Sequence, residues 1–510
     1  MFKTILTIFI PLITISFANT NQYNSKEMVQ SAASYEDNTL EYSSQDDVEN
    51  STFGTNINIT VVTLWYSIFS LWWIISIIIW KIFHPRTNIF KIYNLDDADL
   101  RNKHFAILIP CHNEEIVIKS TVLSLMDLDY PMENIKILVI CDACSDKTEE
   151  IVSDLLPDYQ NLHLLSRSVE DGGNGKGDAL NAGYKYMIDN ILQQDTKYIV
   201  TVFDADSCVD KDMFLRTEYV FQDEKIGACQ SGVRIQDCDT NYLLRYQDME
   251  FALYSFLTQT IRTLCFGTAS LGGNGQFIKQ DTLNELEKNG MWWNIGSLTE
   301  DLEIGVRISL NGWGVSVLNS FVYQQGVKRW GQLLRQRCRW SWGHLTVSFD
   351  AIFKVLISRN INILQKIDWF ILLFFWSIIV TLPIIWIISF LGTFGMLTTS
   401  NMFGMGYSLV LGIIQIPLFL YGMFGSYYVK EYRTIKSFGY LLGFMFYTFH
   451  GILVYYYGLS KIITCRKTRW EKTKRYQNKD EEIEIIIVNT DIVESNIIEL
   501  DIVSEDGPSN

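Results

Sequence analysis

The sequence lacks the paired cysteine spacing that marks small, disulfide-stabilised secreted domains. It has nine cysteines in 510 residues, and most of them fall between residues 111 and 338. Cys141 and Cys144 form a CxxC pair, but a zinc site needs two further ligands and a redox motif needs a different neighbourhood. Reduced thiols in a cytosolic region are therefore the favoured interpretation.

Charged residues are almost missing from four long stretches. Residues 59–82 carry no charge before Lys81, and three further apolar runs cover about 369–395, 406–429 and 437–460. Runs of this length span a hydrocarbon core of ~30 Å as helices, and Trp and Tyr lie near several of their ends, as interfacial rings do. The pattern predicts an integral membrane protein with transmembrane helices at 59–82 and within 369–460. Few polar residues occur in these runs, which disfavours a transporter or channel.

The two ends of the chain are polar or targeting-like. Residues 1–20 fit either a secretory signal peptide or a first transmembrane helix, and residues 21–58 are a polar, extracytoplasmic segment. The formal net charge is −15, but much of it lies in polar flanks, so it indicates no particular partner and gives no sign of nucleic-acid binding. Residues 461–510 read as a basic and then acidic tail.

Loop charge orients the chain. Lys and Arg residues follow the helix at 59–82, and positive charge marks the cytoplasmic side of a membrane. We therefore expect the soluble block, residues 95–332, to be cytoplasmic, in the plasma membrane or, in a eukaryote, in the Golgi or endoplasmic reticulum. The basic residues after 460 also favour a cytoplasmic tail, which three simple crossings would not give, so the number of C-terminal crossings stays open.

Strands and helices alternate in the soluble block, which predicts an α/β domain with a mostly parallel sheet. Expected strands are 104–110, 135–142 and 197–206. Polar residues stand at their ends, listed here in chain order: His112, Asp142, Asp204 and Asp206. Because ligands bind beyond the carboxyl ends of parallel strands, these residues predict a binding site at that edge.

Two motifs in the first part of the block fit a phosphate ligand. Asp204 and Asp206 leave one strand end one residue apart and can share Mg²⁺ or Mn²⁺ with phosphate oxygens, although a solvated loop would explain the pair as well. Lys176 lies in the glycine-rich stretch 172–183, where backbone and a positive charge can meet phosphate. That stretch lacks the order GxxxxGK[ST], so it is not a Walker site.

Two further motifs stand later in the chain. Thr299 and Asp301 belong to a TED sequence that opens an amphipathic helix; Asp301 is either a general base or simply a favourable first-turn acid after an N-cap. Gln336, Arg339 and Trp340 belong to QRCRW, where arginine suits pyrophosphate and tryptophan suits a sugar face. The alternative is an amphipathic helix on the lipid surface, and we assign residues 333–362 to this motif together with an interface helix.

The motifs IPCHNEE, CDACSD, GKGDALN, FDADS, TED and QRCRW occur in this order over about 240 residues. This set resembles the membrane-embedded, processive family 2 glycosyltransferases, such as the cellulose, chitin, hyaluronan and poly-N-acetylglucosamine synthases. The resemblance implies a GT-A domain, with a Rossmann-like mixed sheet, joined to an α-helical transmembrane bundle. One departure is Ala143, where many relatives carry a second acid after Asp142.

The resemblance also implies roles for the marked residues. Asp301 would be the catalytic base, and Asp204 and Asp206 would hold the metal. The nucleotide-sugar pocket would contain the following residues: His112, Glu114, Asp142, Lys176 and Asp204. The pyrophosphate and acceptor would meet Gln336, Arg339 and Trp340, with the GGNG sequence at 272–275 also near the acceptor.

The expected activity is inverting transfer of glucose or N-acetylglucosamine from a UDP-sugar to a growing β-linked polysaccharide, with Mg²⁺ or Mn²⁺ as cofactor. Processive synthesis coupled to export through the membrane is the first hypothesis. The second is a single transfer to a lipid or other acceptor. The expected partners are the UDP-sugar, the glycan acceptor and membrane lipid, with any accessory subunit left open.

Overall fold

The structure is a computed structural model, and it describes residues 100–374, 440, 443–444 and 446–464. The segments predicted at 1–20, 21–58 and 59–82, and most of the predicted C-terminal membrane region and tail, lie outside these residues. Within the described ranges, no helix combines the length and hydropathy needed to cross a membrane.

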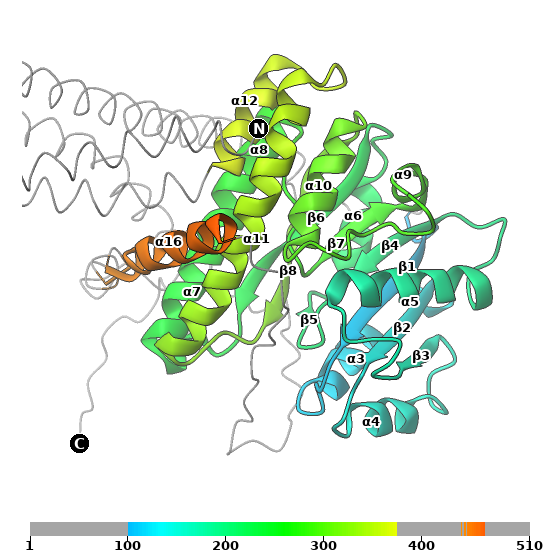
Figure 1. Cartoon of the computed structure of the whole chain (residues 1–510). Helices are drawn as coiled ribbons and strands as arrows, with labels where there is room; N and C mark the ends of the chain where they lie inside the picture. Colours follow the sequence, from blue (N-terminus) through cyan, green and yellow to red (C-terminus); the bar gives the residue numbers. More distant parts are fainter. Residues whose placement is uncertain (1–99, 375–439, 441–442, 445, 465–510) are drawn as a thin grey trace, which may run out of the picture. The chain divides into compact units, whose positions relative to one another are not determined.

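An eight-stranded mixed sheet forms the centre of the described region, in the order β3-β2-β1-β4-β7-β6-β8-β5 (Figure 1). The strands are β1 His104–Cys111, β2 Ile135–Asp142, β3 Leu162–Arg167, β4 Tyr198–Val202, β5 Cys208–Val209, β6 Ile226–Ile235, β7 Gln276–Lys279 and β8 Gly314–Gln324. The four strands β3, β2, β1 and β4 run parallel to one another. β7 runs antiparallel to both of its neighbours, β4 and β6, and β8 is parallel to β6 but antiparallel to β5. The predicted parallel sheet is thus the first half of a mixed one.

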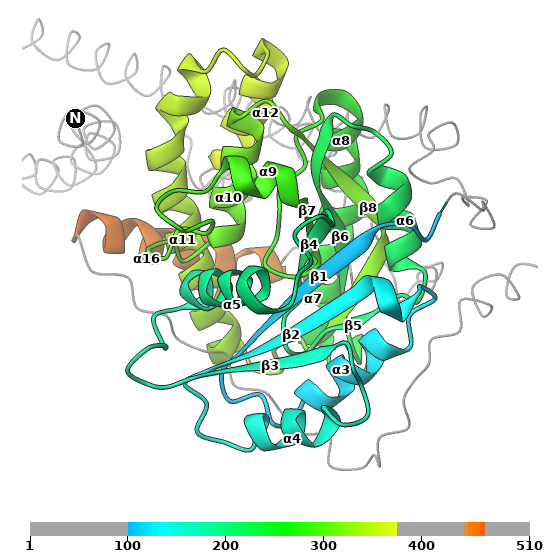
Figure 2. The same cartoon turned by 90° about the vertical axis from the view of Figure 1, so that its right-hand side faces the viewer.

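Helices cover both faces of the sheet. The helices that lie between successive strands in the chain are α3 Ile118–Met126, α4 Thr148–Leu155, α5 Lys176–Asn190, α6 Met213–Val220, α9 Gln280–Glu285 and α10 Glu300–Leu310. Short 3₁₀ turns lie at η1 Met132–Asn134 and η2 Cys238–Thr240. Figure 2 shows the strands β1 to β3 between α5 on one side and α3 and α4 on the other.

The two faces explain why β1 is an unbroken apolar run rather than an alternating one. Phe105 and Ile107 belong to the cluster that also contains residues of α3, α4 and α6. Ala106 and Leu108 point the other way, into the cluster with residues of α5, α9 and α10. A strand buried on both faces needs apolar side chains at every position.

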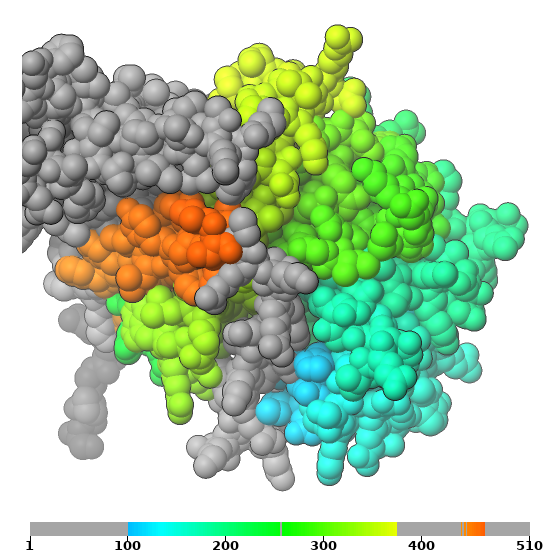
Figure 3. All heavy atoms as spheres, viewed as in Figure 1, coloured from blue at the N-terminus to red at the C-terminus, as the bar shows by residue number. Residues whose placement is uncertain are grey.

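A second group of helices follows the sheet's later strands. α7 Tyr242–Leu253 continues through the π-helix η3 Tyr254–Gln259 into α8 Thr260–Phe266; α11 is Trp330–Ile357, α12 is Ile363–Leu373 and α16 is His450–Ile463. α16 packs on α11 at Gly458, where an added methyl group would lie 2.8 Å from Ser341 Oγ and 3.1 Å from the Trp342 main-chain nitrogen. The orange atoms of α16 accordingly lie against the yellow-green atoms of α11 in Figure 3.

The predicted elements in the first half of the domain are confirmed. The strand expected at 135–142 is β2, and those expected at 104–110 and 197–206 are β1 and β4, the latter ending earlier, at Val202. The helix opened by TED is α10. The interface helix expected within 333–362 has different bounds, because α11 begins at Trp330 and ends at Ile357.

Replacing the fully buried Ile107 by alanine should lower the free energy of unfolding of this domain by about 2–5 kcal/mol, since lost burial and an unfilled cavity add. Ile116→Ala is the matched control, because Ile116 is 40% exposed. Denaturant titration of the two variants checks the expectation, and an equal loss in both would contradict the assigned core.

Candidate active site

The parallel strands place the predicted polar residues along one edge of the sheet. β1, β2 and β4 lie side by side in register, so their carboxyl ends share an edge. His112 follows β1, Asp142 is the last residue of β2, and Asp204 follows β4 by two residues. This edge is where ligands of open parallel sheets bind.

The ammonium of Lys176 is the centre of the site. As the first residue of α5, it donates a hydrogen bond of 2.5 Å to Asp204 Oδ1 and another to the main-chain oxygen of Gly273. Its Nζ also lies 4.0 Å from Glu300 Oε1. Burial alone would lower the pKa of Lys176, but the negative charges of Asp204 and Glu300 outweigh burial and raise it. The side chain therefore stays a cation that joins three separate parts of the chain.

Asp301 lies at the same place. A methyl group added at Gly273 would lie 3.4 Å from Lys176 Nζ and 3.5 Å from Asp301 Oδ2, so both side chains lie near the same glycine. Burial raises the pKa of Asp301, the Leu302 N–H and Lys176 oppose that shift, and the charge of Asp204 adds to it. Asp301 is thus both a first-turn residue of α10 and a member of the acidic cluster. Thr299 occupies the N-cap position, but its side chain makes no capping hydrogen bond, and the role of Asp301 as a base stays a prediction.

Glu300 is an acid that the sequence analysis left without a role. Burial, followed by the charge of Asp301, raises its pKa to about 7, against the opposing effect of Lys176. A carboxyl group that titrates near neutral pH next to a candidate base makes the charge of this cluster sensitive to pH.

The turn after β4 is held by Asn274. Its side-chain oxygen accepts hydrogen bonds from the Asp204 main chain (3.1 Å) and from Ser207 Oγ (2.8 Å). Asp206 is buried, and its Oδ2 accepts a 3.0 Å hydrogen bond from the main chain of Gln325. Asn274 thereby ties the GGNG loop to the turn that carries the two aspartates.

The donor set fits a hard divalent cation. Asp204 and Asp206 supply carboxylate oxygens, the ligands that Mg²⁺ and Mn²⁺ prefer. Asp204 Oδ1 also forms an ion pair with the ammonium of Lys176, so this oxygen already binds a positive charge. No cluster of three or more His, Cys, Asp or Glu side chains among the described residues is arranged to hold a metal. A metal here would therefore take two protein carboxylates and complete its shell with water and phosphate oxygens.

The neighbouring strand ends form a second polar group around Asp142. Asp142 Oδ1 accepts a 2.7 Å hydrogen bond from Arg167 Nη1, and its Oδ2 accepts one of 3.1 Å from the Gly173 main chain. His112 Nδ1 donates to the main-chain oxygen of Asp142 over 2.7 Å. Burial raises the pKa of Asp142, and Arg167 works against that shift.

Arg167 was missed by the sequence analysis. It ends β3 and also contacts Asp178 on α5 at 2.7 Å. Its signal was available, because β3 is a further parallel strand and Arg167 is the polar residue at its carboxyl end.

Glu114 lies between β1 and α3, buried, with its main-chain N–H donating to Thr148 Oγ1 over 2.7 Å.

The QRCRW residues lie on α11, which runs past the start of α10. Gly343, one turn after Trp340, packs so closely that an added methyl group would lie 2.7 Å from Thr299 Cγ2. Gln336 and Arg339 are half-buried. The motif is thus one helical turn from the residue that precedes Glu300 and Asp301.

Arg337, inside the same motif, has a different place. It is 1% exposed, donates to Glu250 Oε2 over 2.9 Å, and its guanidinium lies 4.1 Å from the centre of the Trp340 ring. Tyr447 donates to the same Glu250 oxygen over 2.6 Å. Arg337 therefore fixes the Trp340 ring and joins α7, α11 and the segment before α16.

Comparisons with known proteins find glycosyltransferases among the relatives of this chain. Residues 102–343 match the profile of a family described as "Glycosyltransferase like family 2". A β-monoglucosyldiacylglycerol synthase of Trichormus variabilis is 33% identical over 255 residues, which are 50% of this chain and 52% of that protein. A probable glycosyltransferase of Bacillus subtilis is 25% identical over 73% of this chain and 86% of its own length. A poly-β-1,6-N-acetyl-D-glucosamine synthase of Staphylococcus epidermidis is 23% identical over 59% of this chain and 69% of its own.

A solved structure shares the fold. The mannosyltransferase of Pyrobaculum calidifontis, in complex with GDP-Man and Mn²⁺, aligns with a TM-score of 0.50 at 14% identity, over 80% of this chain and 97% of its own. The region therefore has a GT-A-like mixed-sheet fold, and the family match and the glycosyltransferase relatives identify a sugar-transferring enzyme. More particularly, residues 102–343 match the model of the family 2 glycosyltransferases. The alignment spans about half the length of the Trichormus relative.

Glu300→Gln should make stability less dependent on pH. The pKa of Glu300 is raised from 4.5 to about 7, so the folded protein binds this proton more tightly than the unfolded chain, and wild-type stability falls as pH rises from about 4.5 to 7. The variant avoids that loss and should gain on the order of 1–3 kcal/mol over wild type at pH 8, with the gain vanishing below about pH 4.5. Thermal unfolding at a series of pH values checks this, and a gain independent of pH would contradict it.

Arg167→Met should raise the KM for the donor about tenfold, roughly 1.4 kcal/mol of binding, while kcat changes less, because Asp142, which the sequence analysis predicts to bind the nucleotide, loses its partner. Lys197→Met is the control, since the Lys197–Asp281 pair is largely exposed. Initial rates over a range of donor concentrations give both constants. An unchanged KM would show that the contact between Arg167 and Asp142 does not contribute to donor binding.

Proposed function

We propose that this glycosyltransferase moves glucose or N-acetylglucosamine from a UDP-sugar onto a hydroxyl acceptor with inversion, and that it extends a β-linked polysaccharide processively at a membrane. The carrying observation is the cluster in which Lys176 contacts Asp204, Gly273 and Glu300 beside Asp301. It brings a candidate base, a phosphate-side cation site and a candidate acceptor loop together.

In this proposal Asp301 accepts the proton of the attacking hydroxyl. Burial raises its pKa, which makes its carboxylate a stronger base than an exposed aspartate, and a 2.8 Å hydrogen bond from the Leu302 N–H to its Oδ1 restrains the carboxylate. One base and one displacement invert the anomeric carbon, so an α-linked donor gives a β-linkage. This differs from the paired carboxylates of glycosidases.

Asp204 and Asp206 would hold Mg²⁺ or Mn²⁺, which supplies positive charge for the diphosphate leaving group when bound. Lys176 adds a fixed positive charge on the same side. Gln336 and Arg339 on α11 would close over the pyrophosphate, with the Trp340 ring, held by Arg337, facing the acceptor. Preorganised charges of this kind stabilise a transition state without reorganising.

Exposed apolar side chains support the proposed membrane location. Ile357, at the end of α11, is 77% exposed, and Ile363, at the start of α12, is 67% exposed. Lys354 and Lys366 lie on the same two helices. Apolar residues mixed with lysines suit a helix pair at a lipid surface, with the catalytic domain on the cytoplasmic side.

A second candidate is one transfer to a lipid acceptor. It is favoured by the 33% identity to a β-monoglucosyldiacylglycerol synthase. Both candidates use the same donor side and the same base, and they differ in whether the product is released after one sugar.

Asp301→Asn should lower the rate of UDP release from a UDP-sugar about 10²–10⁴-fold, because the acceptor hydroxyl loses its base. The full chain in membranes is assayed with Mg²⁺ or Mn²⁺, with UDP-glucose and UDP-N-acetylglucosamine in competition. Asp281→Asn, an exposed aspartate on α9, is the matched control and should keep the wild-type rate.

Product length separates the two candidates: a long polymer from the first turnovers supports processive synthesis, and a glycolipid carrying one sugar supports the second. Release of no UDP by the wild type from any common UDP-sugar would rule out both.

A further inference from the structure

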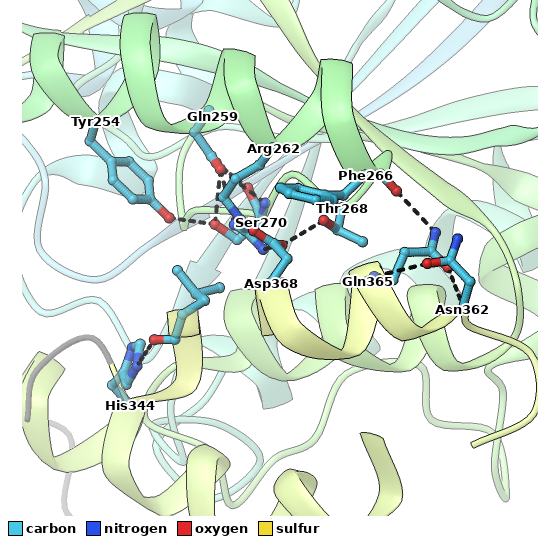
Figure 4. A network of polar contacts seen from close by, with 11 residues as sticks. Tyr254, Gln259, Arg262, Phe266, Thr268, Ser270, His344, Asn362, Gln365 and Asp368 are labelled. Atoms are coloured by element: carbon cyan, nitrogen blue, oxygen red, sulfur yellow. Dashed lines mark hydrogen bonds and ion pairs between the residues drawn. The ribbon is translucent and has the colours of Figure 1, made fainter. Parts of the chain in front are cut away.

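A buried ion pair joins α12 to the segment that leads into the GGNG loop. Arg262 of α8 and Asp368 of α12 are each 1% exposed, with Arg262 Nε and Nη2 both 2.9 Å from Asp368 Oδ2. Thr268 Oγ1 donates to the same oxygen over 2.6 Å. One turn earlier, Gln365 Nε2 donates to the main-chain oxygen of Phe266 over 3.0 Å. Figure 4 shows these contacts along one side of α12.

Stability alone does not explain this pair. Removing two charges from water is costly, and a buried ion pair is often matched or exceeded in stability by apolar residues of similar volume. A pair with several fixed hydrogen bonds instead selects one geometry, which points to a role in positioning.

The geometry continues from Arg262 to Ser270. Arg262 Nη1 donates to Gln259 Oε1 over 3.2 Å, and the same oxygen accepts from the Ser270 main chain over 3.1 Å. Gln259 Nε2 donates to the Ser270 main-chain oxygen over 2.6 Å, and Tyr254 and Ser270 share a 2.5 Å hydrogen bond between their hydroxyls. Tyr254 and Gln259 are the two ends of the π-helix η3, a form that often marks functional sites.

From this serine the chain enters the site within three residues. The Gly272 main chain donates to Gln230 Oε1 over 2.7 Å, and the Gly273 oxygen accepts from Lys176. A methyl group added at Gly273 would lie 3.5 Å from Asp301 Oδ2. A series of polar contacts therefore runs from α12 to Ser270, and three further residues of chain lead from Ser270 to Gly273 beside the candidate base.

The other end of α12 is fixed to α11. His344 Nε2 donates to the main-chain oxygens of Leu372 (3.0 Å) and Leu373 (3.2 Å), and Ser348 Oγ donates to the Leu373 oxygen over 2.5 Å. His344 is one helical turn after Trp340. α12 thus contacts both the helix with QRCRW and the loop with GGNG.

We propose that Asp368 and Arg262 are positioning residues: through Gln259 they fix the Gly272–Gly273 backbone against Asp301, so that an acceptor hydroxyl meets the base in line for transfer. This inference rests on the proposed function. In this proposal α12 holds the GGNG loop, residues 272–275, in a fixed position relative to α11.

The test uses the full-length double variant Arg262→Met/Asp368→Leu, which removes both charges and roughly keeps volume. Transfer to acceptor should fall about 10–100-fold, as expected for a small misplacement of reacting groups, while donor KM and donor hydrolysis without acceptor stay within about twofold. Hydrogen–deuterium exchange of residues 268–275 should rise. Asp368→Asn should likewise lower transfer and raise the exchange of residues 268–275. This single variant replaces the double variant if the double variant does not accumulate.

The control is Arg234→Met/Asp248→Leu, which removes another ion pair with a buried aspartate, 2.7 Å apart. It should lower the thermal midpoint at least as much, yet leave transfer relative to hydrolysis unchanged. Equal loss of transfer in the control, or unchanged exchange of 268–275 in the test variant, would overturn the positioning role. A wild type that turns over no UDP-sugar would reject the proposed function, and the exchange experiment would still decide the positioning role.

Discussion

The site depends on one cation among several acids. Asp204, Glu300 and Asp301 come from two distant parts of the chain, and together they would repel one another in a partly buried site, where Glu300 is buried and the other two are half-buried. The ammonium of Lys176 offsets that repulsion by contacting Asp204 and lying near Glu300. The pKa of Asp301 and that of Glu300 are both raised in spite of it, which shows that burial and mutual repulsion remain large. The lysine therefore makes it possible for the fold to bring these acids together at all.

Two supports bring the acids to the lysine. The parallel strands place Asp142 and Asp204 on one sheet edge, because strands in register end together. The loop with Gly273 and the start of α10 have no such guide. They are placed by side-chain hydrogen bonds from Asn274 and Gln230 and by the tight packing of α11. Precision in the first half comes from the backbone ladder, and in the second half from polar side chains.

This difference explains what the sequence could predict. The strand ends and TED were visible because apolar runs stop there on charged residues, and the structure places Asp204 and Asp301 around one lysine. Asp142 was predicted to line the nucleotide-sugar pocket, and that role stays a prediction. Its two carboxylate oxygens accept hydrogen bonds from Arg167 and Gly173, contacts that no local sequence pattern encodes. The buried pair Arg262–Asp368 was invisible for the same reason, since its partners are 106 residues apart. Contacts that depend on tertiary geometry produce no repeating sequence pattern, unlike the periodic apolar residues of helices and strands.

No disulfide joins any two of the eight cysteines in the described part of the chain. The stability of that part therefore comes from packing and polar contacts, and a reducing buffer should not lower it. Oxidation is the hazard instead: Cys338 and Cys238, both half-buried, can each be joined to a thiol of another molecule once an oxidant is present. Covalent dimers on a non-reducing gel would then be artefacts of handling, and preparation under reductant avoids them.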